Sequence, residues 1–516
     1  MAGLRGLLPR HVPHSHAPAA GGATTQVNAA VRAGAAGLAL AITSVPFAWS
    51  WLVPLPLALL FHELSRAQSR RTAAWLAFVA GTVFFAVHLA WLFTSFTRLF
   101  GPLGGALTLL VVPLIALSWA LVAFLAFHRS TGRTLAALPV VWVLGEAART
   151  LGSLAFPWGA VGYAWLPTPV VQAADLGGLN LLSLLVTGTA AALVAGYRGQ
   201  RLPLVGMLGV LGGLTVYGLT RPALPPPDRT AVMVQGAVPP LDKAVQRQGT
   251  ELDLHLTLTR QGLAGEPADL IVWPESASPR SPADPGTRAA LASLPEPVVT
   301  GAPTSGVGRY WNSAYAFDGG VTGRYDKVHP VPFGEFLPWR QTLAFAYTPV
   351  LGALGLSGLT GVTPGTTYQP LPLRHLRVGA YISYESVFAQ AARTLTANGA
   401  QVLAHLSNDA WFEGTVGKAQ HFQMGRLRAI ETGRYVLRAS NTGISGVIDP
   451  LGRVTFQLPD GERAAGRAAF ALRTGLTTFV RWGDWPVLVA ALLWAGLACS
   501  GYLLNTGGRY DQRTAP

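Results

Sequence analysis

Long runs without a charged residue constrain this chain more than any other feature of its sequence. They occupy most of residues 33–220 and return at 485–508, whereas residues 221–484 have the mixed polarity of a soluble domain. Only 12% of the 516 residues are charged, against about 25% in a typical soluble protein. Apolar runs of this length are typical of helices that cross a bilayer. The distribution predicts membrane spans around one soluble domain of roughly 260 residues, enough for a core of its own.

The individual spans follow from the lengths of the apolar runs, at about 1.5 Å of rise per helical residue. Residues 33–61 are too long for one span and contain three prolines, which predicts a tight hairpin of two short helices. Further spans are expected at 72–97, 102–127, 134–152, 176–196, 202–220 and 485–506. The expected organisation, with about eight spans, is a disordered tail (1–28), a seven-span membrane domain (29–220), a soluble domain (221–480), a last transmembrane helix (481–506) and a C-terminal tail (507–516).

The arginines predict the orientation of these spans. They cluster before the first span and in the loops after the second, fourth and sixth, whereas the alternate loops carry only Arg98 and Arg149. By the positive-inside rule the Arg-rich side faces the cytoplasm. An odd number of spans then delivers residue 221 to the outside, so the soluble domain is expected outside the cytoplasm and the C-terminal tail inside. Orientation accounts for the net charge of +14, and nucleic-acid binding is not expected because no basic stripe is interleaved with aromatic residues.

Within the soluble segment, apolar β-rich runs alternate with helical patterns, which favours an α/β fold. Pro-rich residues 221–228 are expected to link it to the membrane domain. The chain has one cysteine, Cys499, so a disulfide framework or a thiolate metal site is not expected, and no metal or cofactor is predicted. Strands are expected at 230–236, 269–273, 297–301, 377–382, 402–406 and 434–440, and helices at about 247–262, 386–398 and 418–432.

Lysine usage singles out one position in the soluble segment. Of 38 basic residues only Lys243, Lys327 and Lys418 are lysines. A position that keeps lysine in an arginine-rich chain can need a compact ammonium that faces a developing oxyanion, although three lysines can also survive by chance. Lys327 is favoured because the prolines that follow it predict a rigid loop that returns Glu335 toward the same place.

Two further candidates follow buried strands, and the carboxyl ends of strands in α/β sheets face the ligand crevice. Glu275 comes directly after the apolar run that ends in Trp273-Pro274. Ser383 ends another apolar run and opens a turn into a helix, which is where acyl-transfer enzymes place a nucleophile. Each has an ordinary alternative: Glu275 as a surface carboxylate and Ser383 as a helix N-cap.

In their order and spacing, these blocks resemble the carbon–nitrogen hydrolase (nitrilase) superfamily, whose members use a Glu–Lys–Cys triad in an α-β-β-α sandwich. More narrowly, the chain is similar to the apolipoprotein N-acyltransferase family over about residues 30–506. The motifs that carry this resemblance are Trp-Pro-Glu (273–275), Tyr-Asp-Lys-Val-His (325–329), Ser-Asn-Asp-Ala-Trp-Phe (407–412) and Arg-Ala-Ile-Glu-Thr-Gly-Arg (428–434).

The resemblance implies a role for each matching residue. Glu275 would be the general base, Lys327 would stabilise the tetrahedral oxyanion, and Ser383 stands at the position of the nucleophile. Glu335 would hold Lys327, and the backbone N–H of Tyr384 would complete the oxyanion hole. The residues that match positions shaping the acyl and lipid pocket are Glu385, Trp158, Pro338 and Trp411.

The resemblance also implies a reaction and a location. An acyl chain would pass from a membrane phospholipid, through an acyl-enzyme, to the α-amino group of a diacylglyceryl-cysteine lipoprotein, without a cofactor. The expected setting is the bacterial inner membrane, with the α/β domain facing the periplasm or the cell exterior and the protein acting as a monomer among membrane lipids.

Position 383 departs from the family, which has cysteine there. A thiol with a pKa near ~8.5 is ionised far more readily than an alcohol. Three explanations stay open: an engineered Cys→Ser change, a natural serine enzyme, or an inactive relative that binds lipid or lipoprotein. A membrane-tethered amidase is a further alternative. A transporter is disfavoured because ionisable residues in the expected spans are few, chiefly Glu146 and Asp175.

Overall fold

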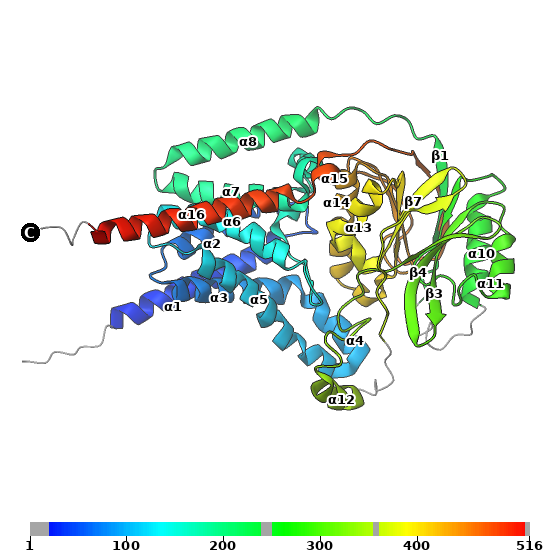
Figure 1. Ribbon diagram of the computed structural model, residues 1–516, viewed down its shortest axis with the longest axis horizontal. Coiled ribbons are helices and arrows are strands. Elements are labelled where there is room, and N and C mark those ends of the chain that lie inside the picture. Colours follow the sequence, from blue (N-terminus) through cyan, green and yellow to red (C-terminus); the bar gives the residue numbers. More distant parts are fainter. Residues whose placement is uncertain (1–19, 239–249, 354–360, 511–516) are drawn as a thin grey trace, which may run out of the picture.

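The computed structural model describes residues 20–238, 250–353 and 361–510. A bundle of long helices occupies one end of the elongated molecule and an α/β part the other (Figure 1). Residues 1–19 of the expected tail lie outside the described residues, but residues 20–28 are helical, which corrects the expectation of disorder. They open α1 (Ala20–Thr43), an alanine-rich helix that packs on α3 (Arg70–His88). Because alanine is the strongest helix former, this segment does not need a charged or capped start to be helical.

Two expectations about the spans are wrong in detail. The hairpin expected at 33–61 pairs α1 with α2 (Pro54–Ser65), so only one of its two helices is short. The span expected at 72–97 is interrupted, because α3 ends at His88 and α4 (Ala90–Ala106) follows with a kink at Gly101, where φ is +69°. The residue after the kink is Pro102, which has no N–H to continue the helical hydrogen bonds.

The helix α4 reaches toward the α/β part, which explains the interruption. The Ser95 hydroxyl donates to the backbone oxygen of Trp411, and Arg98 Nη1 donates to that of Glu413 at 2.6 Å. The second part of this apolar run therefore contacts the α/β part of the protein. In the described part of the chain, four helices are long and apolar enough to cross a membrane: Arg70–His88, Gly101–Ala126, Pro169–Tyr197 and Arg201–Leu219.

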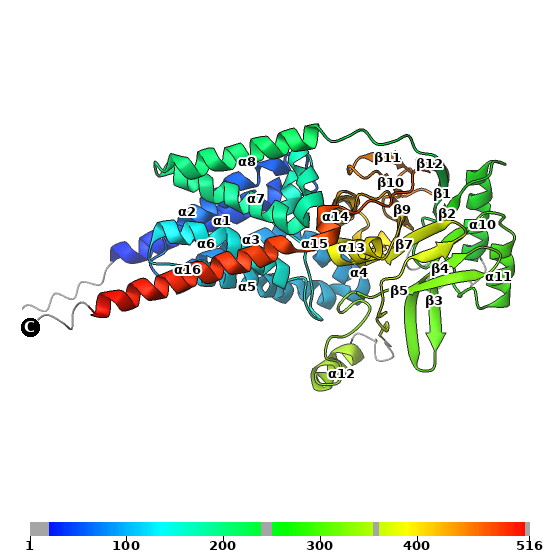
Figure 2. The ribbon, with the colours of Figure 1, turned by 45° about the horizontal axis from the view of Figure 1, so that its top comes forward.

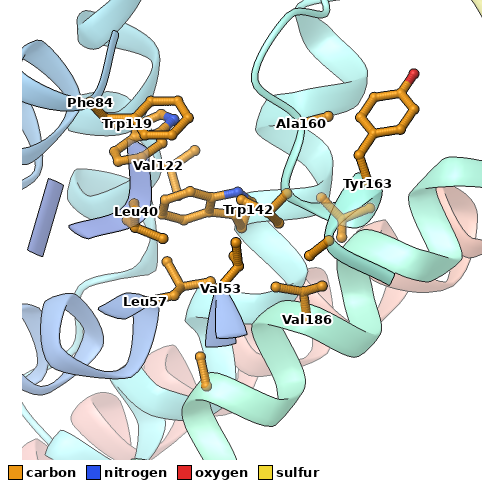
Figure 3. Close-up of a cluster of buried hydrophobic side chains, with 14 of the residues drawn as sticks. Leu40, Val53, Leu57, Phe84, Trp119, Val122, Trp142, Ala160, Tyr163 and Val186 are labelled. Carbon is orange, nitrogen blue, oxygen red and sulfur yellow. The ribbon is translucent and has the colours of Figure 1, made fainter. Parts of the chain in front are cut away.

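The bundle has an apolar core built around tryptophans (Figure 3). The rings of Trp119 and Trp142 lie 4.7 Å apart between their centroids. Tryptophan needs a partner for its N–H when it is buried, and Trp142 Nε1 donates to Glu146 Oε1 at 2.9 Å. The Glu146 carboxylate also accepts from Val161 N and Ser183 Oγ. Glu146 is thus a buried polar group with structural partners.

The remaining helices complete the bundle and the covering layers. The segment expected at 481–506 contains the last two residues of α15 and most of α16, and α16 continues through residues 507–510 of the expected tail. The helices not yet located are η1 (Ser50–Leu52), α5 (Thr108–Ala126), α6 (Thr131–Ala148), η2 (Val161–Trp165), η3 (Pro169–Ala173), α7 (Ala174–Tyr197), α8 (Arg201–Leu219), α10 (Thr250–Leu263), α11 (Pro285–Ala292), α12 (Ala344–Ala353), η4 (Ser383–Val387), α13 (Ala389–Ala397), η5 (Asp409–Phe412), α14 (Gly417–Thr432), α15 (Thr478–Trp482) and α16 (Trp485–Tyr510).

The α/β part consists of two six-stranded sheets, in the orders β12-β1-β2-β3-β4-β5 and β11-β10-β9-β8-β7-β6. The central pairs β1/β2, β2/β3, β7/β8 and β8/β9 are parallel and the outer pairs are antiparallel. Helices α10 and α11 lie outside the first sheet, and α13 and α14 lie between the second sheet and the bundle (Figures 1 and 2). This is the α-β-β-α sandwich expected from the sequence.

The six expected strands correspond to β1, β2, β3, β7, β8 and β9, which are largely buried and apolar. The other strands lie toward the sheet edges. Exposed residues interrupt the apolar pattern in most of them, whereas β10 is buried but only three residues long. The strands are β1 (Arg229–Gln235), β2 (Leu270–Val272), β3 (Val298–Gly306), β4 (Arg309–Phe317), β5 (Val321–Asp326), β6 (Leu371–Leu373), β7 (Leu376–Ile382), β8 (Val402–Ser407), β9 (Val436–Ser440), β10 (Gly446–Ile448), β11 (Val454–Gln457) and β12 (Ala464–Phe470).

Candidate active site

A buried lysine lies between two carboxylates at one edge of the first sheet. Lys327 follows β5 and is 1% exposed, and its Nζ atom lies 3.6 Å from Glu275 Oε1 and 2.8 Å from the Glu335 carboxylate. Asn312 of β4 joins both acids, because its Nδ2 atom donates to Glu275 Oε1 at 2.7 Å and to Glu335 Oε1 at 3.2 Å. The sequence predicted the lysine and the two acids. Asn312 was missed, since only the pairing of β4 with β5 brings it to Lys327.

The protein backbone brings Glu275 close to this group. Glu275 follows β2, and a Cβ atom on Gly301 of β3 would lie 2.7 Å from the Glu275 Cα atom, which is closer than real side chains approach. A glycine is therefore needed at position 301. Glu275 is 7% exposed, so the alternative of an ordinary surface carboxylate is wrong.

The surroundings of Lys327 decide its charge. Burial opposes the ammonium, but the carboxylates of Glu335 and Glu275 outweigh this cost and raise the pKa of Lys327 above its ordinary value. Lys327 is thus a fixed positive charge at neutral pH. A desolvated positive charge of this kind is suited to stabilise an oxyanion that develops beside it.

Ser383 stands in a strained turn at the carboxyl end of β7. Its φ angle is +50°, in the left-handed region that residues other than glycine rarely adopt. The N-cap of η4 is Ile382 and not Ser383, so the alternative of a helix-capping serine is wrong. A sharp strand-to-helix turn exposes the first side chain of the turn above the sheet edge, which is the geometry of a nucleophile elbow.

Glu385 ties the Ser383 turn to the Lys327 loop. It is fully buried, and its carboxylate accepts hydrogen bonds from Tyr325 Oη at 2.7 Å, Val328 N at 2.8 Å and Ile382 N at 2.7 Å. Burial raises the pKa of Glu385 to about 6, against the hydrogen bonds, which lower it. Glu385 therefore connects the two sheets at the site. From the sequence, its position was predicted only through the resemblance, as a residue that shapes the acyl and lipid pocket.

We expect Glu385→Gln to loosen this connection. The substitution replaces one carboxylate oxygen by an NH2 group. In either orientation of the amide, this NH2 group would face an N–H or O–H donor that has lost its acceptor. Leaving buried donors unpaired costs about 1–3 kcal/mol, so the chain should unfold at a lower temperature. A thermal melt in detergent measures this loss. Glu462→Gln, at an exposed site, is the matched control, and equal melting of both variants would contradict the assigned role.

The structure places the remaining predicted site residues around the junction of the bundle and the α/β part. The Tyr384 hydroxyl donates to the backbone oxygen of Ala155 at 2.8 Å. Trp158 is 1% exposed and its indole N–H donates to Gln420 Oε1 at 2.8 Å, so it is a buried wall of this junction. Trp411 is 37% exposed. Pro338 is buried and its backbone oxygen accepts from Tyr347 Oη.

Lys418 does not join the site. Lys418 forms an ion pair with Asp460 at the surface, 2.5 Å between Nζ and Oδ2, and Lys243 lies outside the described residues. Among the described residues no group of three His, Cys, Asp or Glu side chains is arranged to hold a metal ion.

Two stacked six-stranded sheets, with Lys327 between Glu275 and Glu335 and a Ser383 turn tied to the Lys327 loop, agree with the fold expected of a carbon–nitrogen hydrolase. In agreement, the family model described as carbon-nitrogen hydrolase matches residues 233–474. A second model, described as apolipoprotein N-acyltransferase N-terminal domain, matches residues 36–192 in the bundle.

Curated relatives narrow the class to one family. An apolipoprotein N-acyltransferase of Methylococcus capsulatus is 33% identical over 88% of this chain and 92% of its own length. One of Azotobacter vinelandii is 35% identical over 90% and 93%, and one of Allorhizobium ampelinum is 34% identical over 81% and 83%. The chain belongs to the apolipoprotein N-acyltransferase family.

Proposed function

We propose that this chain transfers a fatty acyl chain from a membrane phospholipid to the α-amino group of a diacylglyceryl-cysteine lipoprotein, and that Glu275, Lys327 and Ser383 perform the transfer. The observation that carries the proposal is the Lys327 ammonium held between Glu275 and Glu335, on the loop that Glu385 ties to the Ser383 turn. Family membership supports the acyl acceptor, and the apolar bundle next to the site supports a donor in the membrane. All these residues come from one chain, and we expect a monomer.

In the first step the Ser383 hydroxyl oxygen attacks the ester carbonyl carbon of the phospholipid, and its proton passes to Glu275. The oxyanion that forms faces Lys327 Nζ and the backbone N–H of Tyr384. When the tetrahedral intermediate collapses, the bond to the glycerol oxygen breaks, and that oxygen takes the proton from Glu275. A lysophospholipid leaves, and the acyl chain remains as an ester on Ser383.

In the second step the free α-amino group attacks the ester carbon and gives a proton to Glu275. The same two donors stabilise the second oxyanion. Its collapse forms the amide, breaks the bond to Ser383 and returns the proton to the serine oxygen. The enzyme is regenerated, and neither step requires an oxidant or a cofactor.

The transfer is tested with purified protein, a phospholipid of one acyl composition and a diacylglyceryl-cysteine peptide. The proposal predicts lysophospholipid and N-acylated peptide in equal amounts, and no N-acylated peptide from the Glu275→Gln variant. Lysophospholipid formed with free fatty acid instead would indicate a hydrolase. Turnover of soluble amides without lysophospholipid release would support the membrane-tethered amidase.

We further propose that the bundle spans the inner membrane about eight times with the α/β part facing the periplasm or the cell exterior. Three Arg-rich loops meet at the end of the bundle far from the α/β part (Figure 1). Arg198 Nη2 donates to Ser65 Oγ at 3.0 Å, and the Arg70 guanidinium lies 5.8 Å from the centre of the Phe124 ring. By the positive-inside rule, this Arg-rich end of the bundle is expected to face the cytoplasm.

Cysteine labelling tests this orientation. In a Cys499→Ala background, Gly132→Cys lies in the first turn of α6, beside an Arg-rich loop, and Ala283→Cys lies in the α/β part. Both positions are exposed. An impermeant thiol reagent applied to whole cells should label position 283 and leave position 132 protected, because only one end of the bundle faces outward. Permeabilised cells, in which both should react, are the control. Labelling at position 132 alone would invert the orientation.

A further inference from the structure

A second buried polar network contacts the Ser383 turn. It consists of His405 from β8, Asp409 from η5, His421 from α14 and Arg438 from β9. Each of the four side chains is at most 2% exposed. Burying so many polar groups is costly unless they are fully hydrogen-bonded, and the proposed chemical steps do not use them.

Two histidines of the network contact the same backbone atom. His405 Nε2 lies 3.1 Å and His421 Nε2 3.3 Å from the carbonyl oxygen of Ser383. The direction of the His405 bond follows from its other nitrogen, since Arg438 Nη1 lies 2.7 Å from His405 Nδ1 and arginine can only donate. Nδ1 is therefore the acceptor, Nε2 carries the proton, and His405 donates to the Ser383 carbonyl.

Further contacts hold the His405 ring in place. Arg438 Nη2 donates to Asp409 Oδ2 at 2.6 Å, and Asp409 Oδ1 lies 2.9 Å from His421 Nδ1. The His405 ring also stacks on Tyr381 with 4.8 Å between centroids. Ser386, His421 and Asp409 resemble a hydrolase triad, with 2.8 Å between Ser386 Oγ and His421 Nε2. Ser386 is fully buried, however, so a substrate cannot reach it.

The Ser383 carbonyl belongs to the same peptide group as the N–H of Tyr384. In a planar trans peptide these two bonds point in opposite directions. Fixing the carbonyl from behind therefore fixes the direction in which the Tyr384 N–H points. This peptide follows a residue with φ of +50°, a conformation that costs on the order of 1–3 kcal/mol and needs support from its surroundings. A hydrogen bond to the carbonyl also polarises the peptide and strengthens its N–H as a donor.

We propose that His405 is a positioning residue that aims the Tyr384 N–H at the oxyanion, with Arg438 and Asp409 fixing its donor nitrogen. The inference rests on the proposed function, because it requires that Tyr384 N–H be an oxyanion donor. It adds a residue that acts through the backbone and does not touch the substrate.

A matched pair of substitutions isolates the donor. In His405→Asn, the amide oxygen takes the place of Nδ1 and accepts from Arg438, but the shorter side chain no longer donates to the Ser383 carbonyl, which keeps only the 3.3 Å contact with His421 Nε2. In His405→Gln, the longer side chain can accept from Arg438 and also donate to that carbonyl. Acylation of the parent chain and of its Ser383→Cys form is measured with phospholipid. The Asn variant should acylate about tenfold or more slowly at unchanged KM, a part of the loss seen when an oxyanion donor is removed, and the Gln variant should stay close to the parent.

A spectroscopic measurement reads the peptide directly, without activity. Ser383-Tyr384 is the only Ser-Tyr pair in the chain, so labelling serine carbonyl carbon with ¹³C and tyrosine nitrogen with ¹⁵N gives one coupled amide signal. That signal should shift in the Asn variant and stay near its parent position in the Gln variant. His405→Phe, which keeps the ring against Tyr381 but lacks the donor, replaces the Asn variant if the latter does not fold.

The outcomes separate the two claims. An unmoved amide signal in a folded Asn or Phe variant would overturn the positioning role. Equal acylation by the Asn and Gln variants would also overturn it, while the proposed function would stand. If the signal moves as expected but no form of the chain is ever acylated by phospholipid, His405 still positions the Tyr384 N–H and the proposed function fails.

Discussion

Lys327→Arg is expected to abolish acyl transfer while leaving the fold intact. Lys327 is 1% exposed, and its Nζ atom fits between Glu275 Oε1 at 3.6 Å and the Glu335 carboxylate at 2.8 Å. A guanidinium keeps the charge but is wider and planar, so it cannot present one compact donor to the oxyanion. Losing such a donor costs on the order of 10²–10³ in rate. The rate of lysophospholipid release measures the loss.

The chain supplies a matched control for this substitution. Lys418→Arg changes the same residue type at a surface ion pair with Asp460 and should leave the rate unchanged, since surface pairs contribute at most about 1 kcal/mol. Glu275→Gln should be as damaging as Lys327→Arg because no proton acceptor remains. Near-normal activity of either variant would mean that the site is wrongly placed.

Ser383→Cys is expected to raise the activity strongly. A thiol is ionised far more readily than an alcohol. Lys327 carries a fixed positive charge, and it lies on the loop that Glu385 connects to the Ser383 turn. The serine form should turn over slowly, and the rise in N-acylated peptide measures the difference. Ser386→Cys, at a buried position three residues further on, is the control and should not be acylated.

The result also decides between the explanations for serine at this position. Strong rescue by cysteine fits a site that is intact except for its nucleophile. A serine form as fast as its cysteine variant would mean that the pocket is built around an alcohol. A folded cysteine variant that stays inactive would leave only a protein that binds lipid or lipoprotein.

The sequence predicted those parts of the site that lie on continuous apolar strands. Glu275 and Ser383 follow β2 and β7, whose buried residues are apolar, aromatic or glycine, so the pattern offered both positions as candidates and the resemblance to the family gave them their roles. Asn312 and His405 could not be predicted in this way. Their roles depend on strand neighbours that are remote in the sequence, β5 for Asn312 and the turn after β7 for His405.

The helical bundle shows a different limit. Hydropathy predicts that a segment is buried in an apolar environment, but it does not distinguish lipid from protein. The run at 72–97 was expected to be one span, yet its second half carries Ser95, which bonds to Trp411 of the α/β part. Trp158, which the resemblance places at the acyl and lipid pocket, lies buried and its indole N–H donates to Gln420 of the α/β part.

The most direct test of the account is the intact mass of the protein after incubation with a phospholipid of one acyl composition. The acyl-enzyme requires a covalent bond between the acyl carbon and residue 383. We expect one added acyl mass on the peptide that contains this residue, abundant in the Ser383→Cys form and accumulating slowly in the serine form. Addition of a diacylglyceryl-cysteine peptide should remove it from the cysteine form. A folded Ser383→Cys protein that gains no acyl mass, or gains it on another peptide, would contradict the account.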